Sequence, residues 1–183
     1  MSLLGLPYEC VHVDLFKAAH KQPAFLAMNV FGQVPVIEDG ELVIADSNAI
    51  LVYLGERYDE QHRFWPATAE GKAAVQRWFS IAAGQLAAGP GAARRARLLG
   101  AKLDYEAAVA VTQQLFKTLE AELTARDYLV GSAPTLADVA LYAYVARAPE
   151  GDISLEPYPA VRAWLGRLEA LPGFVPMQQT TGS

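Results

Sequence analysis

The spacing of apolar and polar residues changes early in the chain, from a period typical of strands to one typical of helices. Apolar and polar side chains alternate over residues 9–15, which predicts a β-strand. A helical turn is predicted around Ala24–Met28. Two short strands are predicted at Val34–Glu38 and Glu41–Ile44. They are joined at Asp39-Gly40, because Asp-Gly between apolar runs tolerates the positive φ of a hairpin turn.

From Asp46 onward, apolar residues recur at the spacing of a helix. Residues 60–69 are polar, contain Pro66 and are predicted to be a linker. Further on, Gly89-Pro90-Gly91 interrupts the helical pattern, because proline lacks the N–H that a helix interior requires. Besides the helix that starts near Asp46, helices are expected over Lys72–Leu86, Ala92–Leu99, Tyr105–Ala125, Leu136–Arg147 and Pro159–Leu171.

These patterns predict a mixed α/β domain over 1–59, the linker over 60–69 and an all-helical domain over 70–183. Of the 183 residues, 52% are apolar and 19% are charged, a composition that supports a sizeable core and excludes a disordered chain. The net charge of −5, without a basic stripe, argues against nucleic acid as a partner.

The single cysteine, Cys10, excludes an intrachain disulfide and fits a reducing compartment, so a cytoplasmic location is expected. Its place in the alternating segment predicts a buried, inert thiol, because free cysteines commonly pack as small apolar residues. His12, His20 and His62 lack the spacing of metal ligands, so no metal site is predicted. No apolar run approaches the ~20 residues that cross a bilayer, so no membrane partner is expected.

Three short motifs could together bind a small zwitterionic peptide, and each also has a plainer structural explanation. A cis Val34-Pro35 bond would leave the Val34 backbone free to pair with a peptide. Only about 5–6% of X-Pro bonds are cis, however, so the residues alone favour a trans proline at a strand edge. Asp46-Ser47 could hold an ammonium and a carboxylate at a helix N-terminus, although both residue types usually cap helices. His20-Lys21 could clamp a second carboxylate or could be a solvated pair.

Taken together, these motifs resemble the cytosolic glutathione S-transferase superfamily, in particular its bacterial theta- or beta-like members. Asn29–Pro35 resembles the family's Asn-Pro-x-Gly-x-Val-Pro sequence, with Val30 in place of the usual proline. Asp46–Leu51 resembles the start of the helix that holds the γ-glutamyl group of glutathione. The resemblance implies an α/β thioredoxin-like N-terminal domain, here incomplete, followed by an all-α C-terminal helical bundle.

The resemblance also implies which residues bind glutathione. Val34 would bond to the cysteinyl main chain, with Pro35 cis, and Asp46 and Ser47 would hold the γ-glutamyl amine and carboxylate. The remaining candidates, expected near the glycyl carboxylate, are His20, Lys21 and Gln33.

A separate match lies in the second half, where Pro134–Asp138 resembles the family's N-capping box. Thr135 and Asp138 are expected to satisfy each other's backbone N–H groups at the start of a helix. This box is a structural capping element, and its loss would cost about 1 kcal/mol or more.

The family begins with a strand, a loop and a helix that would precede the segment resembled here. Together they amount to roughly 20 residues. Without that first strand, residues 9–15 would have no neighbour to pair with. Either the native protein starts upstream of Met1, with Met1 inside the first helix, or the N-terminal domain is rearranged; we expect the first. The family's thiol-activating residue lies on that first loop. Because neither Tyr8 nor Cys10 matches its position, no catalytic residue is assigned.

The resemblance implies a detoxifying enzyme that binds glutathione as co-substrate, transfers its thiolate to a small apolar electrophile and forms a homodimer. A non-catalytic binding or interaction module is an alternative, as is a glutathione-dependent disulfide reductase or peroxidase. The Lys72–Leu99 region could offer a dimer face. The aromatic residues that could line the electrophile site, or could equally be plain core, are Phe79, Tyr105, Tyr142, Tyr144 and Trp164.

Overall fold

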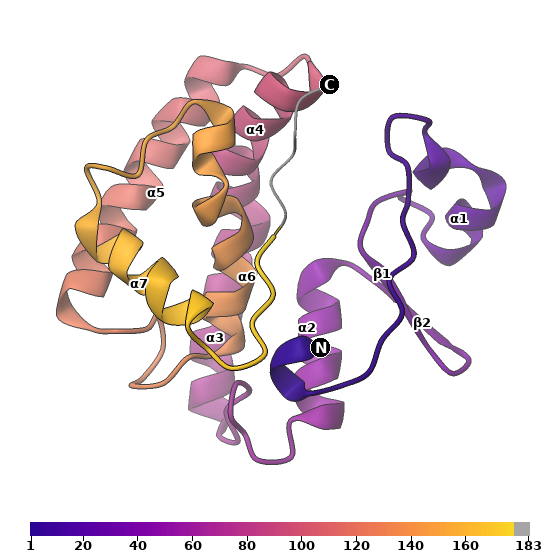
Figure 1. Cartoon of the computed structure of the whole chain (residues 1–183), viewed down its shortest axis with the longest axis horizontal. Helices are drawn as coiled ribbons and strands as arrows, with labels where there is room; N and C mark the ends of the chain where they lie inside the picture. The colour runs from indigo at the N-terminus through magenta and orange to yellow at the C-terminus, as the bar shows by residue number, and fades with distance from the viewer. Residues whose placement is uncertain (178–183) are drawn as a thin grey trace.

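The computed structural model describes residues 1–177, and Figure 1 shows a small N-terminal part beside a helical bundle. Helix α2 lies between the β-hairpin and the bundle. The elements of the first part are η1 Ser2–Leu4, η2 Ala19–Lys21, α1 Pro23–Met28, β1 Val36–Asp39, β2 Leu42–Ala45 and α2 Ser47–Tyr58. The helical turn predicted around Ala24–Met28 and the helix predicted from Asp46 are both confirmed.

The second part is built from helices. Its elements are α3 Ala69–Ile81, the π-helical turn η3 Ala82–Leu86, α4 Pro90–Leu99, α5 Tyr105–Ala125, α6 Leu136–Ala146, the 3₁₀ turn η4 Ala148–Gly151 and α7 Pro159–Glu169. All five predicted helices are present, with ends that differ by at most a few residues. Helix α3 starts earlier than predicted because the Thr68 hydroxyl accepts a hydrogen bond from the Gly71 N–H at 3.1 Å.

The core of the second part forms where the apolar faces of these helices meet. Helix α5 packs against α4 and α7, and α3 packs against α6. The large side chains of Val75, Phe116, Leu119, Leu141 and Trp164 are fully buried. Burial of apolar surface on this scale is the main favourable contribution to folding.

The predicted hairpin is present, but its turn is displaced by one residue. Strands β1 and β2 pair antiparallel with Asp39 opposite Leu42, so the loop residues are Gly40 and Glu41 and not Asp39-Gly40. Gly40 takes the positive φ of 62° that the turn requires. Asp39 stays in the ladder, where its Oδ2 accepts hydrogen bonds from the hydroxyls of Tyr53 and Tyr58 on α2.

The strand predicted over residues 9–15 is wrong. The sheet that the structure describes contains only β1 and β2, and residues 9–13 take part in none of the described backbone hydrogen bonds. An alternating segment forms a strand only where a partner supplies the other half of the ladder. Val11 is 77% exposed, and Cys10 is exposed as well. The prediction of a buried Cys10 is therefore also wrong, since it rested on the same strand.

The capping box at the start of α6 is confirmed. The fully buried Asp138 carboxylate accepts hydrogen bonds from the Thr135 N–H at 2.8 Å, the Leu129 N–H at 2.9 Å and the Trp164 indole N–H at 2.9 Å. Burial raises the pKa of the Asp138 carboxyl, and its hydrogen bonds oppose that shift. One side chain thus ties α6 to α7 and to the loop before α6.

The segment between the two parts is firmly held. The carboxylate of Asp59, which is 4% exposed, accepts hydrogen bonds from the N–H groups of Arg63, Phe64 and Trp65. The Phe64 carbonyl in turn accepts from Leu136 at the start of α6. These contacts fix α2 against the helical bundle and hold the first residues of the segment predicted as a linker.

Within the described residues, none of the helices combines the length and the apolar character needed to cross a membrane.

Candidate functional site

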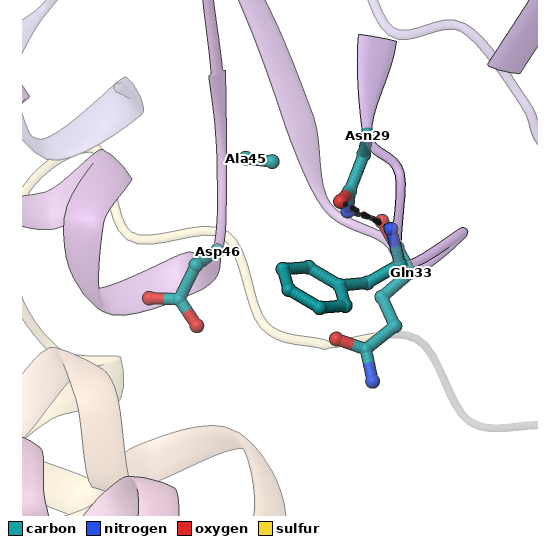
Figure 2. A pocket seen from close by; sticks show the side chains of 5 residues that line it. Asn29, Gln33, Ala45 and Asp46 are labelled. Atoms are coloured by element: carbon teal, nitrogen blue, oxygen red, sulfur yellow. Dashed lines mark hydrogen bonds between the residues drawn. The ribbon is translucent and has the colours of Figure 1, made fainter. Parts of the chain in front are cut away.

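A hollow of about 360 Å³ lies between two segments of the N-terminal part. One is the turn that follows α1, and the other is the junction between β2 and α2. Figure 2 shows Asn29 and Gln33 on one wall, with Ala45 and Asp46 on the other. Phe31 completes the lining. The hollow therefore joins the two motifs that the sequence singled out, since Gln33 belongs to the first and Asp46 to the second.

The turn over residues 29–33 is fixed by the side chain of Asn29, which is 7% exposed. Its Oδ1 accepts from the Phe31 N–H at 3.1 Å, and its Nδ2 donates to the Gln33 carbonyl at 2.8 Å. Gly32 has a φ of +56°, and a Cβ there would lie 2.7 Å from the His20 carbonyl oxygen. Only glycine fits this position, so the sequence specifies the shape of this wall.

Lys21 supports the same turn from outside. Its ammonium donates to the carbonyls of Phe31 at 3.0 Å and Gly32 at 2.9 Å. His20 is half-buried, and its Nδ1 is buried without a partner among the described residues. Neither residue lines the hollow, so the structure does not bring His20 and Lys21 together with Gln33 and Asp46.

The Val34-Pro35 peptide bond is cis, as the resemblance implies and against the trans bond that the residues alone favour. Both side chains are exposed, Val34 to 42%. The paired ladder begins only at Val36, and no hydrogen bond within residues 1–177 uses the Val34 N–H or C=O. The backbone of Val34 is thus free to pair with a ligand.

Asp46 caps helix α2. Its backbone has a φ of 78°, and its Oδ1 accepts from the N–H groups of Asn48 at 2.9 Å and Ala49 at 3.0 Å. The plain capping function is therefore confirmed for Asp46. Its Oδ2 and the exposed hydroxyl of Ser47 have no hydrogen-bond partner among the described side chains and backbone groups. One residue can thus cap the helix with one oxygen and present the other to a ligand.

Three lining residues, Asn29, Phe31 and Ala45, were not assigned a role from the sequence. Asn29 belongs to the Asn29–Pro35 motif and makes two hydrogen bonds to its own turn. The spacing of residues in a sequence does not show whether an asparagine makes such bonds or faces solvent. Phe31 is 74% exposed and follows an equally exposed Val30. Consecutive exposed apolar residues on a rigid turn are the signal that could have identified this wall.

The five aromatic candidates for an electrophile site separate into two groups. Phe79, Tyr142 and Trp164 are at most 5% exposed and belong to the core, whereas Tyr105 and Tyr144 are half-buried. Among the described residues, no group of three or more His, Cys, Asp or Glu side chains is placed to hold a metal ion.

Comparison with known proteins identifies the family. The model described as the glutathione S-transferase N-terminal domain matches residues 1–56, and that of the C-terminal domain matches residues 93–172. Glutathione S-transferase 3 of Zea mays is 36% identical over 93% of this chain and 81% of its own length. Glutathione S-transferase theta-2 of Homo sapiens is 30% identical over 92% of this chain and 73% of its own.

Solved structures agree with these relatives. A possible glutathione S-transferase from Rhodopseudomonas palustris superposes with a TM-score of 0.86 at 33% identity, covering 100% of this chain and 83% of that one. A glutathione transferase homolog from Lodderomyces elongisporus, crystallised with two GSH per subunit, superposes with a TM-score of 0.83 at 27% identity. The match covers 94% of this chain and 86% of that one. The expected fold, a small thioredoxin-like domain followed by a helical one, is thereby confirmed. The chain belongs to the cytosolic glutathione S-transferase superfamily.

Proposed function

We propose that this protein is a glutathione transferase that holds glutathione in the hollow between the 29–33 turn and the start of α2. The observation that carries the proposal is that free polar groups lie in the hollow and next to it. Asp46 lines the hollow, and Val34 and Ser47 each directly follow a lining residue in the sequence. The Val34 backbone, the Asp46 Oδ2 and the Ser47 hydroxyl are all unpaired in residues 1–177. The glutathione bound to the Lodderomyces relative supports glutathione as the ligand.

Each group suits one part of the tripeptide. The backbone of Val34 would pair with the cysteinyl main chain. The Asp46 carboxylate would receive the γ-glutamyl ammonium, and the Ser47 hydroxyl, at the positive end of α2, would receive the γ-glutamyl carboxylate. Gln33, which lines the hollow, would face the glycyl end, whereas His20, a candidate for the same end, does not line the hollow. The ammonium of Lys21 would act chiefly by holding the turn in place.

The bound glutathione would transfer its thiolate to an apolar electrophile that lies against the helical half. A thiol must lose its proton to become a strong nucleophile. No residue of this chain is assigned that task. The relatives are named as transferases, so the reductase, peroxidase and non-catalytic alternatives are not favoured.

A homodimer, a cytoplasmic location and the division into 1–59, 60–69 and 70–183 belong to the same proposal. The arginine-rich α4 and the exposed Leu99 support the Lys72–Leu99 region as the dimer face. The lone, exposed Cys10 thiol supports a reducing compartment. The match to the N-terminal family model ends at residue 56 and the match to the C-terminal model begins at residue 93, which supports the division.

Calorimetric titration of glutathione into the full chain tests the proposal. Wild-type protein is expected to bind, and Ser47→Ala is expected to weaken the affinity roughly tenfold. A hydrogen bond to a charged group contributes about 1.5 kcal/mol or more, and 1.4 kcal/mol is tenfold. The matched control is Ser154→Ala. Ser154 is exposed, lies outside the hollow and accepts a hydrogen bond from the Glu156 N–H, so the variant should bind glutathione as tightly as wild type. Absence of wild-type binding would refute the proposal.

A further inference from the structure

The first two residues of α2 make different contacts. The hydroxyl of Ser47 is unpaired in the described structure, whereas the side chain of Asn48 reaches the helical half. Its Nδ2 donates to the backbone carbonyl of Phe79 on α3 at 3.1 Å, across 31 positions of sequence. Asn48 does not line the hollow that Asp46 lines. It therefore connects the end of α2 that borders the hollow to α3 without occupying the site.

The point that Asn48 contacts is rigid. Phe79 is 1% exposed, and its ring stacks on that of Trp65 with 6.3 Å between ring centres and 8° between planes. The backbone of Trp65 is in turn held by Asp59 at 2.8 Å. Because the Phe79 carbonyl belongs to a closely packed region, a hydrogen bond to it fixes the position of the start of α2 relative to α3.

Helix α3 changes geometry just beyond this contact. The π-helical turn η3 begins at Ala82, whose N–H bonds to the carbonyls of both Trp78 and Phe79. The next residues, Ala83, Gly84 and Gln85, are exposed, and a Cβ added to Gly84 would meet nothing within 4 Å. Single π-turns inside helices occur frequently at functional sites. Asn48 thus holds α3 immediately before a turn that faces open space.

We propose that Asn48 is a positioning residue that sets the wall formed by the end of α3 and η3 at a fixed place relative to bound glutathione. The inference rests on the proposed function, because it assumes glutathione in the hollow. The electrophile would then meet this wall beside the glutathione sulfur. Loss of the Asn48 contact would shift the wall but leave the glutathione groups where they are.

A second contact between the same helices provides a matched control. The Lys72 ammonium on α3 pairs with Glu56 at the other end of α2, at 2.5 Å. Glu56 lies eight positions after Asn48 in the helix, which is about 12 Å along the axis. Lys72→Met therefore removes an α2–α3 tie far from the hollow, while Asn48→Ala and the isosteric Asn48→Asp remove the one beside it.

The test compares two ligands by calorimetry on the full chain. The ligands are glutathione and S-hexylglutathione, whose sulfur carries a six-carbon apolar chain. Wild type is expected to bind S-hexylglutathione more tightly, because the chain buries apolar surface against the wall. In both Asn48 variants, the ratio of S-hexylglutathione affinity to glutathione affinity should fall at least fivefold. The glutathione affinity itself should stay within twofold of wild type. Lys72→Met should keep both affinities.

Each outcome decides something. An affinity ratio that is unchanged in the Asn48 variants would overturn the proposal. A ratio that falls equally in Lys72→Met would also overturn it, since either result would make Asn48 an ordinary structural contact. Wild type that binds both ligands equally would also overturn it. Wild type that binds neither would refute the proposed function itself, which is a different result. Circular dichroism of each variant identifies any that fails to fold, and Asn48→Asp then replaces Asn48→Ala.

Discussion

The helical half and the N-terminal part of this molecule stabilise themselves in different ways. The helical half buries its largest side chains completely, among them Phe116, Leu141 and Trp164. The N-terminal part leaves Val11, Phe16, Val30 and Phe31 more than 70% exposed. This part buries only a few large side chains, namely Phe25, Ile50 and Leu54. Its 29–33 turn is held by polar side chains that bond to the backbone, those of Asn29 and Lys21.

This difference separates stability from binding. Packed helices supply most of the free energy of folding, because buried apolar area is what contributes it. A turn held by hydrogen bonds keeps its backbone and side chains open to solvent, and these are the groups that a peptide ligand needs. The proposed binding site therefore belongs to the part that buries fewer large side chains, and the helical half would serve as its support.

Replacement of Asp138 by alanine should produce the largest loss of stability. The substitution leaves the buried N–H groups of Leu129, Thr135 and Trp164 without an acceptor. Each unsatisfied buried donor costs about 1–3 kcal/mol, so the free energy of unfolding should fall by roughly 4 kcal/mol. Urea denaturation followed by tryptophan fluorescence measures this change.

The control for that experiment is Asp104→Ala. Asp104 also caps a helix, but it is exposed and bonds only to the Ala107 N–H. Its loss should cost about 1 kcal/mol. Equal losses in the two variants would mean that the Asp138 network contributes no more than a surface cap.

A pair of apolar substitutions tests the contrast between the two parts directly. Leu141→Ala opens a cavity in the helical core and should cost about 2–5 kcal/mol. Phe16→Ser removes a side chain that is 77% exposed and should change stability by less than about 0.5 kcal/mol. Thermal unfolding of both variants supplies the comparison. A large loss in Phe16→Ser would show that the N-terminal segment is covered in solution and would break the contrast.

The same contrast explains which elements the sequence predicts. Tyr105–Ala125 is a helix with the bounds expected from its spacing, because a helix pairs its backbone within itself. The alternation over residues 9–15 has the right period for a strand, but a strand needs a neighbouring strand to pair with. The local pattern of residues does not show whether such a neighbour is present. Asp46 can be recognised from the sequence as a helix cap or a ligand. Only the structure shows that one carboxylate oxygen caps α2 and that the other has no hydrogen-bond partner among the described residues.

The smallest expected effect concerns the clamp that holds the hairpin to α2. The hydroxyl of Tyr53 donates to Asp39 at 2.6 Å, and this hydrogen bond to a carboxylate raises the pKa of Tyr53 to about 12. The same bonds from Tyr53 and Tyr58 lower the pKa of Asp39. Because the folded pKa of Tyr53 lies above its unfolded value of 10.0, its contribution to stability is complete below pH 10. That contribution is lost as pH rises toward about 12.

Absorbance titration near 295 nm measures the ionisation of Tyr53 as the difference between wild type and Tyr53→Phe. The difference should appear near pH 12 and move toward pH 10 in the Asp39→Asn background, where the carboxylate charge is gone. Tyr142, whose pKa is also raised, cancels in this subtraction because both proteins contain it. A difference centred at pH 10 in wild type would mean that the clamp does not form. The hairpin would then be held to α2 by packing alone, and the two parts of the molecule would be more alike than their hydrogen bonds suggest.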